Sequence, residues 1–242
     1  MENEYESKYH KIENDYWWFI ARRDIIYKLL QNLNISKNSE ILEIGCSGGV
    51  LLEFLRQNGF QNLSGLDISK KAIDLCKRRN LKNTFVMDAL KPNLNKTYDV
   101  IIALDVLEHL EDDSQALSEW NKLLKVNGKL LVFVPAFNFL WSSHDVVNKH
   151  YRRYSKKQLT TLLSESNFKI IRASYWNLTL FYPISIYRIF SRIFNSKQKK
   201  DQMFDVSYLT NKILLILVRF ENKILEKINF PVGVSFFVIV EK

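Results

Sequence analysis

The chain has 242 residues, which suits one α/β domain with an added segment better than two independent domains. Its net charge of +9 favours an anionic partner, which could be a nucleic acid, a phosphate-bearing substrate or a membrane surface. Two cysteines, Cys46 and Cys76, are too few for a disulfide framework and have no metal-ligand spacing with histidine. We therefore expect no metal site, and the absence of a signal peptide at the acidic start predicts a cytoplasmic protein.

The first part of the chain, residues 5 to 32, precedes any strand pattern. Its apolar spacing predicts a helix packed on the main domain. Trp17 and Trp18 then either belong to the core or cover a ligand.

From Ile41 to Val134 the pattern alternates between strand and helix at the spacing of right-handed βαβ units, which predicts a parallel sheet. The expected strands are 40–45, 63–67, 83–87, 98–104 and 129–134. The expected helices are 49–58, 69–79 and 113–125, the last beginning at Asp112, Asp113 or Ser114 and ending at Gly128.

The first of these strands ends in a glycine-rich turn. It reads Glu-x-Gly-x-Ser-x-Gly over Glu43, Gly45, Ser47 and Gly49. A backbone that turns tightly from strand into helix and lets a ligand approach its amides cannot carry a Cβ at those points. The turn therefore predicts a ligand site at the carboxyl end of the strand.

Acidic residues follow at the ends of the next strands: Asp67, then Asp88 with Ala89, then Asp105. An acid at Asp67 suits a carboxylate that accepts both ribose hydroxyls, which a nicotinamide-dependent oxidoreductase would also show. The whole series resembles, in order, the motifs of the class I S-adenosylmethionine-dependent methyltransferases. The later acids, Asp88 and Asp105, favour this family over the oxidoreductase.

That resemblance implies a Rossmann-like sheet of seven mostly parallel strands, with helices on both faces and an antiparallel last strand. It implies S-adenosyl-L-methionine as cofactor. Asp67 would hold the ribose, Ile68 would pack on the adenine, Asp88 and the Ala89 amide would read the adenine edge, and Gly45 and Gly49 would leave room for the methionine moiety. Ser47 departs from the pattern, which usually has glycine there.

The resemblance also assigns Glu43, Cys46 and Asp105 to the cofactor site. Residues ahead of the glycine turn often cover the cofactor in this fold, so residues 1–35 would form a helical lid. Arg22 or Arg23 could then pair with the cofactor carboxylate in a forked contact.

The segment after the fifth strand, residues 135 to 155, is rich in polar and aromatic side chains. We expect it to place a general base and an anion clamp over the transferred methyl group. Its candidate catalytic residues are His144, His150, Arg152, Arg153 and Tyr154. In the alternative interpretation His144 only anchors the loop, and the two arginines only pair with surface carboxylates.

His109 is a separate catalytic candidate, because it begins the turn after the fourth strand. Packing in the core is an equally good explanation for it. Together with the early Trp-Trp-Phe and Arg-Arg, the Trp-Ser-x-His-Asp and His-x-Arg-Arg-Tyr sequences of the 135–155 segment resemble a bacterial and archaeal methyltransferase subgroup often linked with cell-surface glycan or lipid biosynthesis.

The sixth and seventh strands are expected at 168–175 and 234–240, with a helical insertion at 176–231 between them. Such a long connection predicts a function of its own. Pro183 opens a basic amphipathic helix, and a second helical pattern follows. The segment 183–228 could bind an anionic membrane surface, or it could pack on the sheet or on a second subunit to form a homodimer.

The sequence thus predicts a single methyltransferase domain over 1–242, with a small-molecule, glycan or lipid-linked acceptor and O-methylation favoured. The expected location is the cytoplasm, with a peripheral position at the inner face of the membrane as the alternative. An RNA- or DNA-directed methyltransferase is the less favoured alternative, because no nucleic-acid module is evident. A non-catalytic S-adenosylmethionine-binding or membrane-associated protein is the other.

Overall fold

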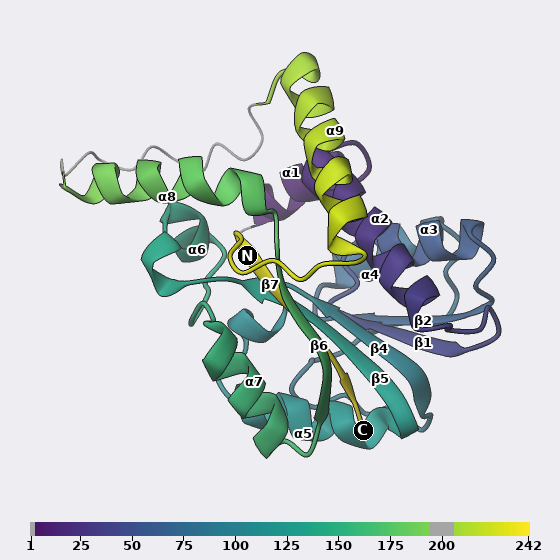
Figure 1. Cartoon of the computed structure of the whole chain (residues 1–242). Helices are drawn as coiled ribbons and strands as arrows, with labels where there is room; N and C mark the ends of the chain where they lie inside the picture. Colours follow the sequence, from purple (N-terminus) through teal and green to yellow (C-terminus); the bar gives the residue numbers. More distant parts are fainter. Residues whose placement is uncertain (1–2, 194–205) are drawn as a thin grey trace.

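The computed structural model describes residues 3–193 and 206–242, which form one seven-stranded sheet with the order β3-β2-β1-β4-β5-β7-β6 (Figure 1). The strands are β1 Glu40–Ile44, β2 Asn62–Asp67, β3 Thr84–Val86, β4 Tyr98–Leu104, β5 Leu124–Pro135, β6 Lys169–Trp176 and β7 Ser235–Glu241. Strand β7 runs antiparallel to both of its neighbours, whereas the pairs among β1 to β5 are parallel. The predicted fold class is confirmed.

Helices cover both faces of the sheet. Figure 1 shows α2 Trp17–Asn32, α3 Val50–Gln57 and α4 Lys70–Arg78 on one side, and α5 Asp113–Leu123 and α7 Lys156–Glu165 on the other. Local capping explains several of the boundaries: the Ser69 side chain accepts from the Ala72 N–H, and the Asp112 side chain accepts from the Gln115 N–H.

Two expected boundaries differ from the structure. The helix α5 ends at Leu123, so Gly128 does not end it but lies within β5, where an added Cβ would come within 2.8 Å of the Lys125 carbonyl oxygen. The N-terminal segment forms two helices, α1 Asn3–Ile12 and α2, instead of one. The residues Glu13 to Asp15 form a turn that redirects the chain between them.

The insertion forms α8 Leu178–Ile193 and α9 Tyr208–Leu225, which extend away from the sheet in Figure 1. Helix α8 begins before Pro183, so the expectation that this proline opens the helix is wrong. The carboxylate of Glu221 on α9 caps the first turn of α8, where it accepts hydrogen bonds from the Leu178 and Thr179 N–H groups at 2.8 and 2.7 Å. Residues 194–205, between the two helices, lie outside the described ranges, whereas the second helical pattern lies within them and forms α9.

The base of α9 is tied to the domain through one buried amide. Asn222 accepts a hydrogen bond from Trp176 Nε1 at 2.8 Å and donates one to the Ala21 carbonyl at 2.8 Å. The insertion is therefore anchored to both β6 and α2. The main core consists of the buried faces of the central strands and of α2, α3, α5 and α7.

Candidate functional site

A cavity of about 1230 Å³ lies at the carboxyl ends of the parallel strands. This is where ligands bind in open α/β sheets. The cavity is lined by the strand ends from β1 to β4, the loop after β5, the helices α1 and α2, Ile184 and Arg188 of α8, and the start of β7. The residues that line it include Tyr9, His10, Trp17, Trp18, Gly45, Ser47, Asp67, Ile68, Asp88, Ala89, Asp105, Glu108, His109, His144, His150, Ile184 and Arg188.

Asp67 is fixed at the end of β2 by backbone hydrogen bonds. Its carboxylate accepts from the Ser47 N–H and the Ser69 N–H, both at 2.9 Å. Burial raises the pKa of Asp67, although these two bonds oppose the shift. The next side chain, Ile68, is 74% exposed and offers an apolar surface beside the carboxylate. The pair fits the ribose and adenine roles expected from the sequence.

Asp88 and Ala89 lie at the end of β3. Asp88 Oδ1 accepts from the Leu90 N–H at 2.8 Å, and the Ala89 carbonyl accepts from Trp120 Nε1 at 2.9 Å. Both residues therefore have a fixed backbone at the cavity wall. Both residues line the cavity, as Ile68 does, which suits contact with the edge of an adenine ring.

The glycines of the turn are required by the protein's own packing as well as by a ligand. Gly45 and Gly49 have φ values of +70° and +77°. A Cβ on Gly45 would come within 2.4 Å of Val106, and one on Gly49 within 2.5 Å of Leu81. Gly45 borders the cavity, but Gly49 packs against the α4 side, so the expectation that Gly49 makes room for the methionine moiety is not supported by this arrangement.

The Cys46 side chain also lies behind the turn. Its Sγ is 4.0 Å from Cys76 Sγ, both thiols are buried, and the Cys76 thiol donates to the Ser47 carbonyl at 3.2 Å. Cys46 thus supports the loop from the core side, and any contact with the cofactor would be through its backbone.

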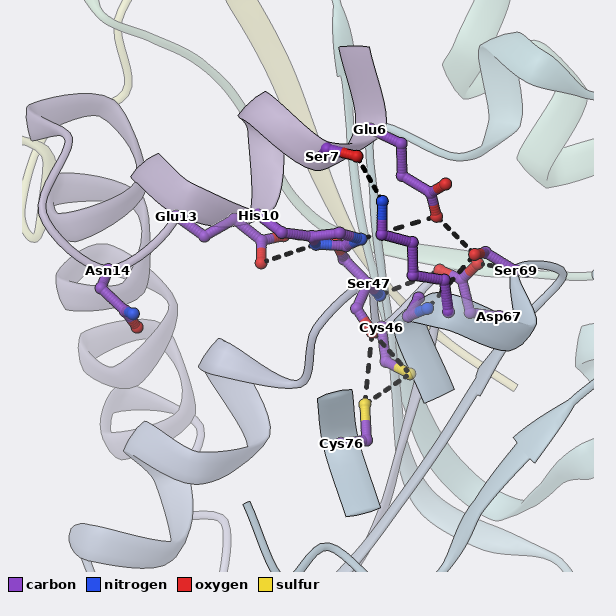
Figure 2. Close-up of polar contacts among 12 residues, drawn as sticks. Glu6, Ser7, His10, Glu13, Asn14, Cys46, Ser47, Asp67, Ser69 and Cys76 are labelled. Carbon is purple, nitrogen blue, oxygen red and sulfur yellow. Dashed lines mark hydrogen bonds and ion pairs between the residues drawn. The ribbon is translucent and has the colours of Figure 1, made fainter. Parts of the chain in front are cut away.

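Ser47, which replaces the usual glycine, connects the turn to α1. Its hydroxyl donates to the Glu13 carboxylate and lies 3.3 Å from His10 Nδ1 (Figure 2). A second tie runs from Ser69 to Glu6, also drawn in Figure 2. The backbone at Ser47 has a φ of +48°, which glycine would adopt more easily. The serine therefore costs some backbone strain and provides an attachment point for the N-terminal helix.

Two of the expected cofactor residues are buried side chains beneath the cavity. Glu43 is 5% exposed, its Oε2 has no hydrogen-bond partner among the described residues, and burial raises its pKa well above the usual range. Arg22 forms an ion pair with Asp105 and a hydrogen bond with Tyr9. It orients Asp105, whose φ is +52°, instead of pointing freely into the site.

Arg23, the other candidate for the cofactor carboxylate, serves the turn between α1 and α2. Its guanidinium donates to the carbonyl oxygens of Glu13 at 2.6 Å and Asn14 at 2.8 Å. It therefore holds the two N-terminal helices at their observed angle.

The loop after β5 is organised around Asp145, the last residue of the Trp-Ser-x-His-Asp sequence, for which no role was predicted. It lies on α6 Ser143–Val147, is fully buried, and accepts from Arg153 Nε at 2.7 Å, Arg153 Nη2 at 3.0 Å and His150 Nδ1 at 2.9 Å. Burial alone would raise its pKa, but His150 and Arg153 hold the pKa of Asp145 well below its usual range. Arg153 donates to Asp145 through Nε and Nη2 and to the Ala136 carbonyl through Nη1. Its guanidinium is therefore not positioned as an anion clamp.

Arg152 and Tyr154 face away from the cavity. Arg152 Nη1 lies 2.6 Å from Asp113 Oδ2, and the Tyr154 hydroxyl donates to the same oxygen at 2.7 Å. Burial and this bond raise the pKa of Tyr154 above its ordinary value. Both side chains border a separate, smaller hollow. They support the loop in this structure, whereas a catalytic role was expected for them.

Three histidines meet at the cavity wall. The ring centroids of His109 and His150 are 4.5 Å apart, and those of His144 and His150 are 5.9 Å apart. Burial, with help from His150, lowers the pKa of His109 to about 4, which keeps its imidazole neutral at physiological pH. Beside them lies Glu108, which is fully buried. The grouping of Glu108 with His109 and His150 was missed by sequence reasoning, because β5 and the following loop separate the two histidines in the chain.

The fold and the cavity together are those of a class I methyltransferase. A family model described as a methyltransferase domain matches residues 17–173, and the chain belongs to this family. The expected methyltransferase class and its cofactor, S-adenosyl-L-methionine, are therefore confirmed at the level of the family.

The individual relatives match parts of the chain. A ubiquinone biosynthesis O-methyltransferase of Pelagibacter ubique is 36% identical over 107 residues, which cover 42% of this chain and 43% of that protein. Another, of Rickettsia canadensis, is 30% identical over 144 residues and 60% of its length is covered. The chain thus spans about half the length of the curated relatives it matches.

Solved structures support the fold over nearly the whole chain. An S-adenosylmethionine-dependent methyltransferase from Archaeoglobus fulgidus has a TM-score of 0.55 at 19% identity and covers 91% of this chain and 94% of its own. The N-methyltransferase NodS from Bradyrhizobium japonicum, in complex with S-adenosyl-L-homocysteine, has a TM-score of 0.54 at 16% identity over 91% of this chain and 86% of its own.

Proposed function

We propose that the chain transfers the methyl group of S-adenosylmethionine to a hydroxyl oxygen of a small-molecule acceptor. The observation that carries this proposal is the single cavity that joins Asp67, Ile68 and Asp88 to the three histidines. Its volume of about 1230 Å³ exceeds the roughly 300–1,000 Å³ typical of a site for one ligand, so an acceptor has room beside the cofactor. The names of the curated relatives, O-methyltransferases of ubiquinone biosynthesis, support oxygen as the methylated atom.

The protein's own groups supply binding and proton transfer. When bound, S-adenosylmethionine supplies a methyl group on a sulfonium centre. The carboxylate of Asp67 is preset by the Ser47 and Ser69 amides to accept ribose hydroxyls. At the other end, His144 and His150 border the cavity, and either can accept the proton of an acceptor hydroxyl. Asp145 orients His150 through Nδ1, which leaves Nε2 for that role.

The described part of residues 1–35 serves as the lid of this site. Tyr9, His10, Trp17 and Trp18 form its part of the cavity wall. Polar side chains attach helix α1, as in the Ser69 to Glu6 bond, and such a contact can open without exposing a large apolar surface. Opening of α1 would admit the cofactor, and closure would exclude water from the transfer.

The 183–228 segment supports a lipid-linked or otherwise apolar acceptor at an anionic membrane surface. Apolar side chains on α9 form an exposed stripe: Leu209, Ile213, Ile216, Phe220 and Ile224. Lys212, Arg219 and Lys223 each precede a member of that stripe, which suits an interface with anionic lipid. No helix in the described ranges is long and apolar enough to span a membrane, so this contact would be interfacial.

The insertion also reaches the site itself. Ile184 and Arg188 of α8 border the cavity, so an acceptor with an apolar tail could pass from the insertion to the histidines. A glycan carried on a lipid would satisfy the same arrangement. Pairing of the stripe with a second copy of the chain is the alternative. Vesicle binding and the oligomeric state in solution distinguish a membrane contact from a dimer.

The test of the proposed function is calorimetric titration of the purified chain with S-adenosylmethionine, S-adenosylhomocysteine and NAD. We expect the first two to bind and NAD not to bind. Asp67→Ala should abolish binding, because the ribose loses its acceptor, whereas Asp74→Ala, which removes a surface carboxylate paired with Lys70 on α4, should leave it unchanged. Binding of NAD alone, or equal binding by both variants, would refute the proposal.

A further inference from the structure

Three potential metal ligands converge at the acceptor end of the cavity. One carboxylate oxygen of Glu108 and one ring nitrogen each of His109 and His150 all lie within 4.8 Å of one another. Glu108 and His109 belong to the short helix η1 Leu107–His109 after β4, and His150 comes from the loop after α6. The Tyr151 N–H donates to the Glu108 carbonyl at 2.8 Å, which holds the two segments together.

Glu108 is the least satisfied member of the group. Its side chain is 0% exposed, and neither carboxyl oxygen is hydrogen-bonded to another described residue. A buried carboxyl group without a partner is costly, and native proteins almost always provide it with a donor, a counter-charge or a bound ion. Burial and the charge of Asp105 raise its pKa well above the usual range, although Arg22 and Arg153 oppose the shift.

The two imidazoles are oriented as metal ligands usually are. His150 Nδ1 lies 2.9 Å from Asp145 Oδ1, so we assign the proton to Nδ1, which leaves Nε2 with the lone pair for a metal. Asp145 is itself held by both ends of the Arg153 fork. His109 is bonded to the backbone of Asn148. A carboxylate or carbonyl behind each histidine fixes the ring and raises its basicity as a ligand.

We propose that Glu108, His109 and His150 bind a divalent first-row transition-metal ion. Two imidazoles and one carboxylate are a donor set that suits Zn²⁺, Mn²⁺ or Fe²⁺ and not Mg²⁺ or Ca²⁺, which prefer oxygen. Ligand atoms about 2.1 Å from one ion lie about 3.4 Å apart in tetrahedral geometry, so the three atoms, now within 4.8 Å of one another, must draw together around the ion. Three protein ligands leave coordination positions open toward the cavity.

The role of the ion rests on the proposed function. An acceptor hydroxyl that occupies an open position has a lowered pKa, because the cation stabilises the alkoxide or phenolate oxygen. The O–H bond breaks, the proton passes to His144 or to water, and the electron pair stays on the oxygen, which becomes the nucleophile. His150 is then a metal ligand, and His144 is the residue left to accept the proton.

Metal binding is tested directly, without turnover. The chain is treated with a chelator, dialysed, and titrated with Co²⁺ followed by visible absorption and with Zn²⁺ followed by calorimetry. We expect one equivalent of each to bind, and Mg²⁺ not to bind. Glu108→Gln and His150→Gln should each weaken binding at least tenfold. Glu111→Gln, which changes an exposed carboxylate three residues further along the chain, should bind like the parent protein.

Each variant is also titrated with S-adenosylmethionine, and a variant that binds it is folded around the cavity. Loss of metal with retained cofactor binding supports the site. If the parent protein takes up no Co²⁺ or Zn²⁺, or if both variants bind metal as tightly as Glu111→Gln does, the inference is overturned. In that case the proposed function still stands if S-adenosylmethionine binds, so the failure of one claim is distinguishable from the failure of the other.

Discussion

At the scale of single residues, Asp145 organises the loop that lines the acceptor side of the cavity, although it was not among the candidate residues chosen from the sequence. It is a fully buried carboxylate whose charge is balanced by Arg153 and whose geometry sets the tautomer of His150. The residues expected to act on the acceptor, Arg153 and Tyr154, stabilise the loop instead. The position of His150 at the cavity therefore depends on a residue that does not itself line the cavity.

Removing the charge of Asp145 should be strongly destabilising. In Asp145→Asn the buried guanidinium of Arg153 loses its counter-charge, and breaking a buried pair in this way costs about 3–5 kcal/mol. Because the pKa of Asp145 is depressed in the folded state, its contribution is present above the unfolded pKa near 3.9 and is lost as the pH falls below it. The free energy of unfolding, measured in urea at pH 7, checks the expectation.

The matched control is Asp112→Asn. Asp112 caps α5, and asparagine is as good a cap, so this change should have an effect close to zero. A loss of less than about 1 kcal/mol in Asp145→Asn would show that Arg153 finds another acceptor and that the loop does not depend on the pair.

At the scale of elements, the N-terminal segment shows what periodicity can and cannot establish. The apolar spacing predicted a helix over residues 5 to 32, and the helix α2 accounts for most of it. The division into α1 and α2 was not predictable from that pattern. It depends on polar contacts from α1 to residues far along the chain, such as Ser47 and Ser69, and these become neighbours only once the sheet has formed.

The docking of α1 should depend on pH through His10. Burial lowers the pKa of His10, but its hydrogen bond with Glu13 and the charges of Glu13 and Glu6 outweigh burial, so the net shift is upward. A histidine whose pKa is raised by folding contributes stability that is fully present below its unfolded pKa of about 6.5 and is lost as the pH rises through the folded value. The contribution should be about 1 kcal/mol or less, as for partly exposed ion pairs.

We expect the parent protein to lose stability between pH 6 and pH 9 relative to His10→Gln, which lacks the titrating group. Lys11→Gln changes the neighbouring exposed position on α1 and should keep the pH profile of the parent. Denaturant unfolding at a series of pH values measures both. Parallel profiles for the parent and His10→Gln would mean that His10 takes no part in holding α1.

At the scale of the whole molecule, the sheet and the cofactor half of the site follow from the sequence more fully than the acceptor half. Alternating strand and helix patterns with right-handed connections place Gly45, Asp67 and Asp88 at one edge of a parallel sheet. The side chains of the acceptor half depend on loop geometry. No periodic pattern specifies that His109 and His150 meet, or that Arg152 turns toward Asp113.

The exposed stripe on α9 is a feature of the described residues that the fold itself does not explain. Ile213, Ile216 and Phe220 are 56%, 68% and 62% exposed on a helix whose base is firmly anchored by Asn222. A globular protein seldom leaves such a row of apolar side chains in water without a partner. If that partner is an anionic bilayer, the stripe should enter the interface while the neighbouring basic side chains contact the headgroups.

We therefore expect the chain to sediment with vesicles of phosphatidylcholine and phosphatidylglycerol, but much less with vesicles of phosphatidylcholine alone, and to be released by salt. Ile213→Ser with Phe220→Ser should weaken vesicle binding at least tenfold, because each buried apolar side chain contributes roughly 1.5–3 kcal/mol. Ile171→Ser, at an exposed position on β6, serves as the control. Unchanged binding in the double variant would exclude the stripe as the membrane contact. If the parent protein instead ignores vesicles and forms a dimer that the double variant dissociates, a second copy of the chain covers the stripe.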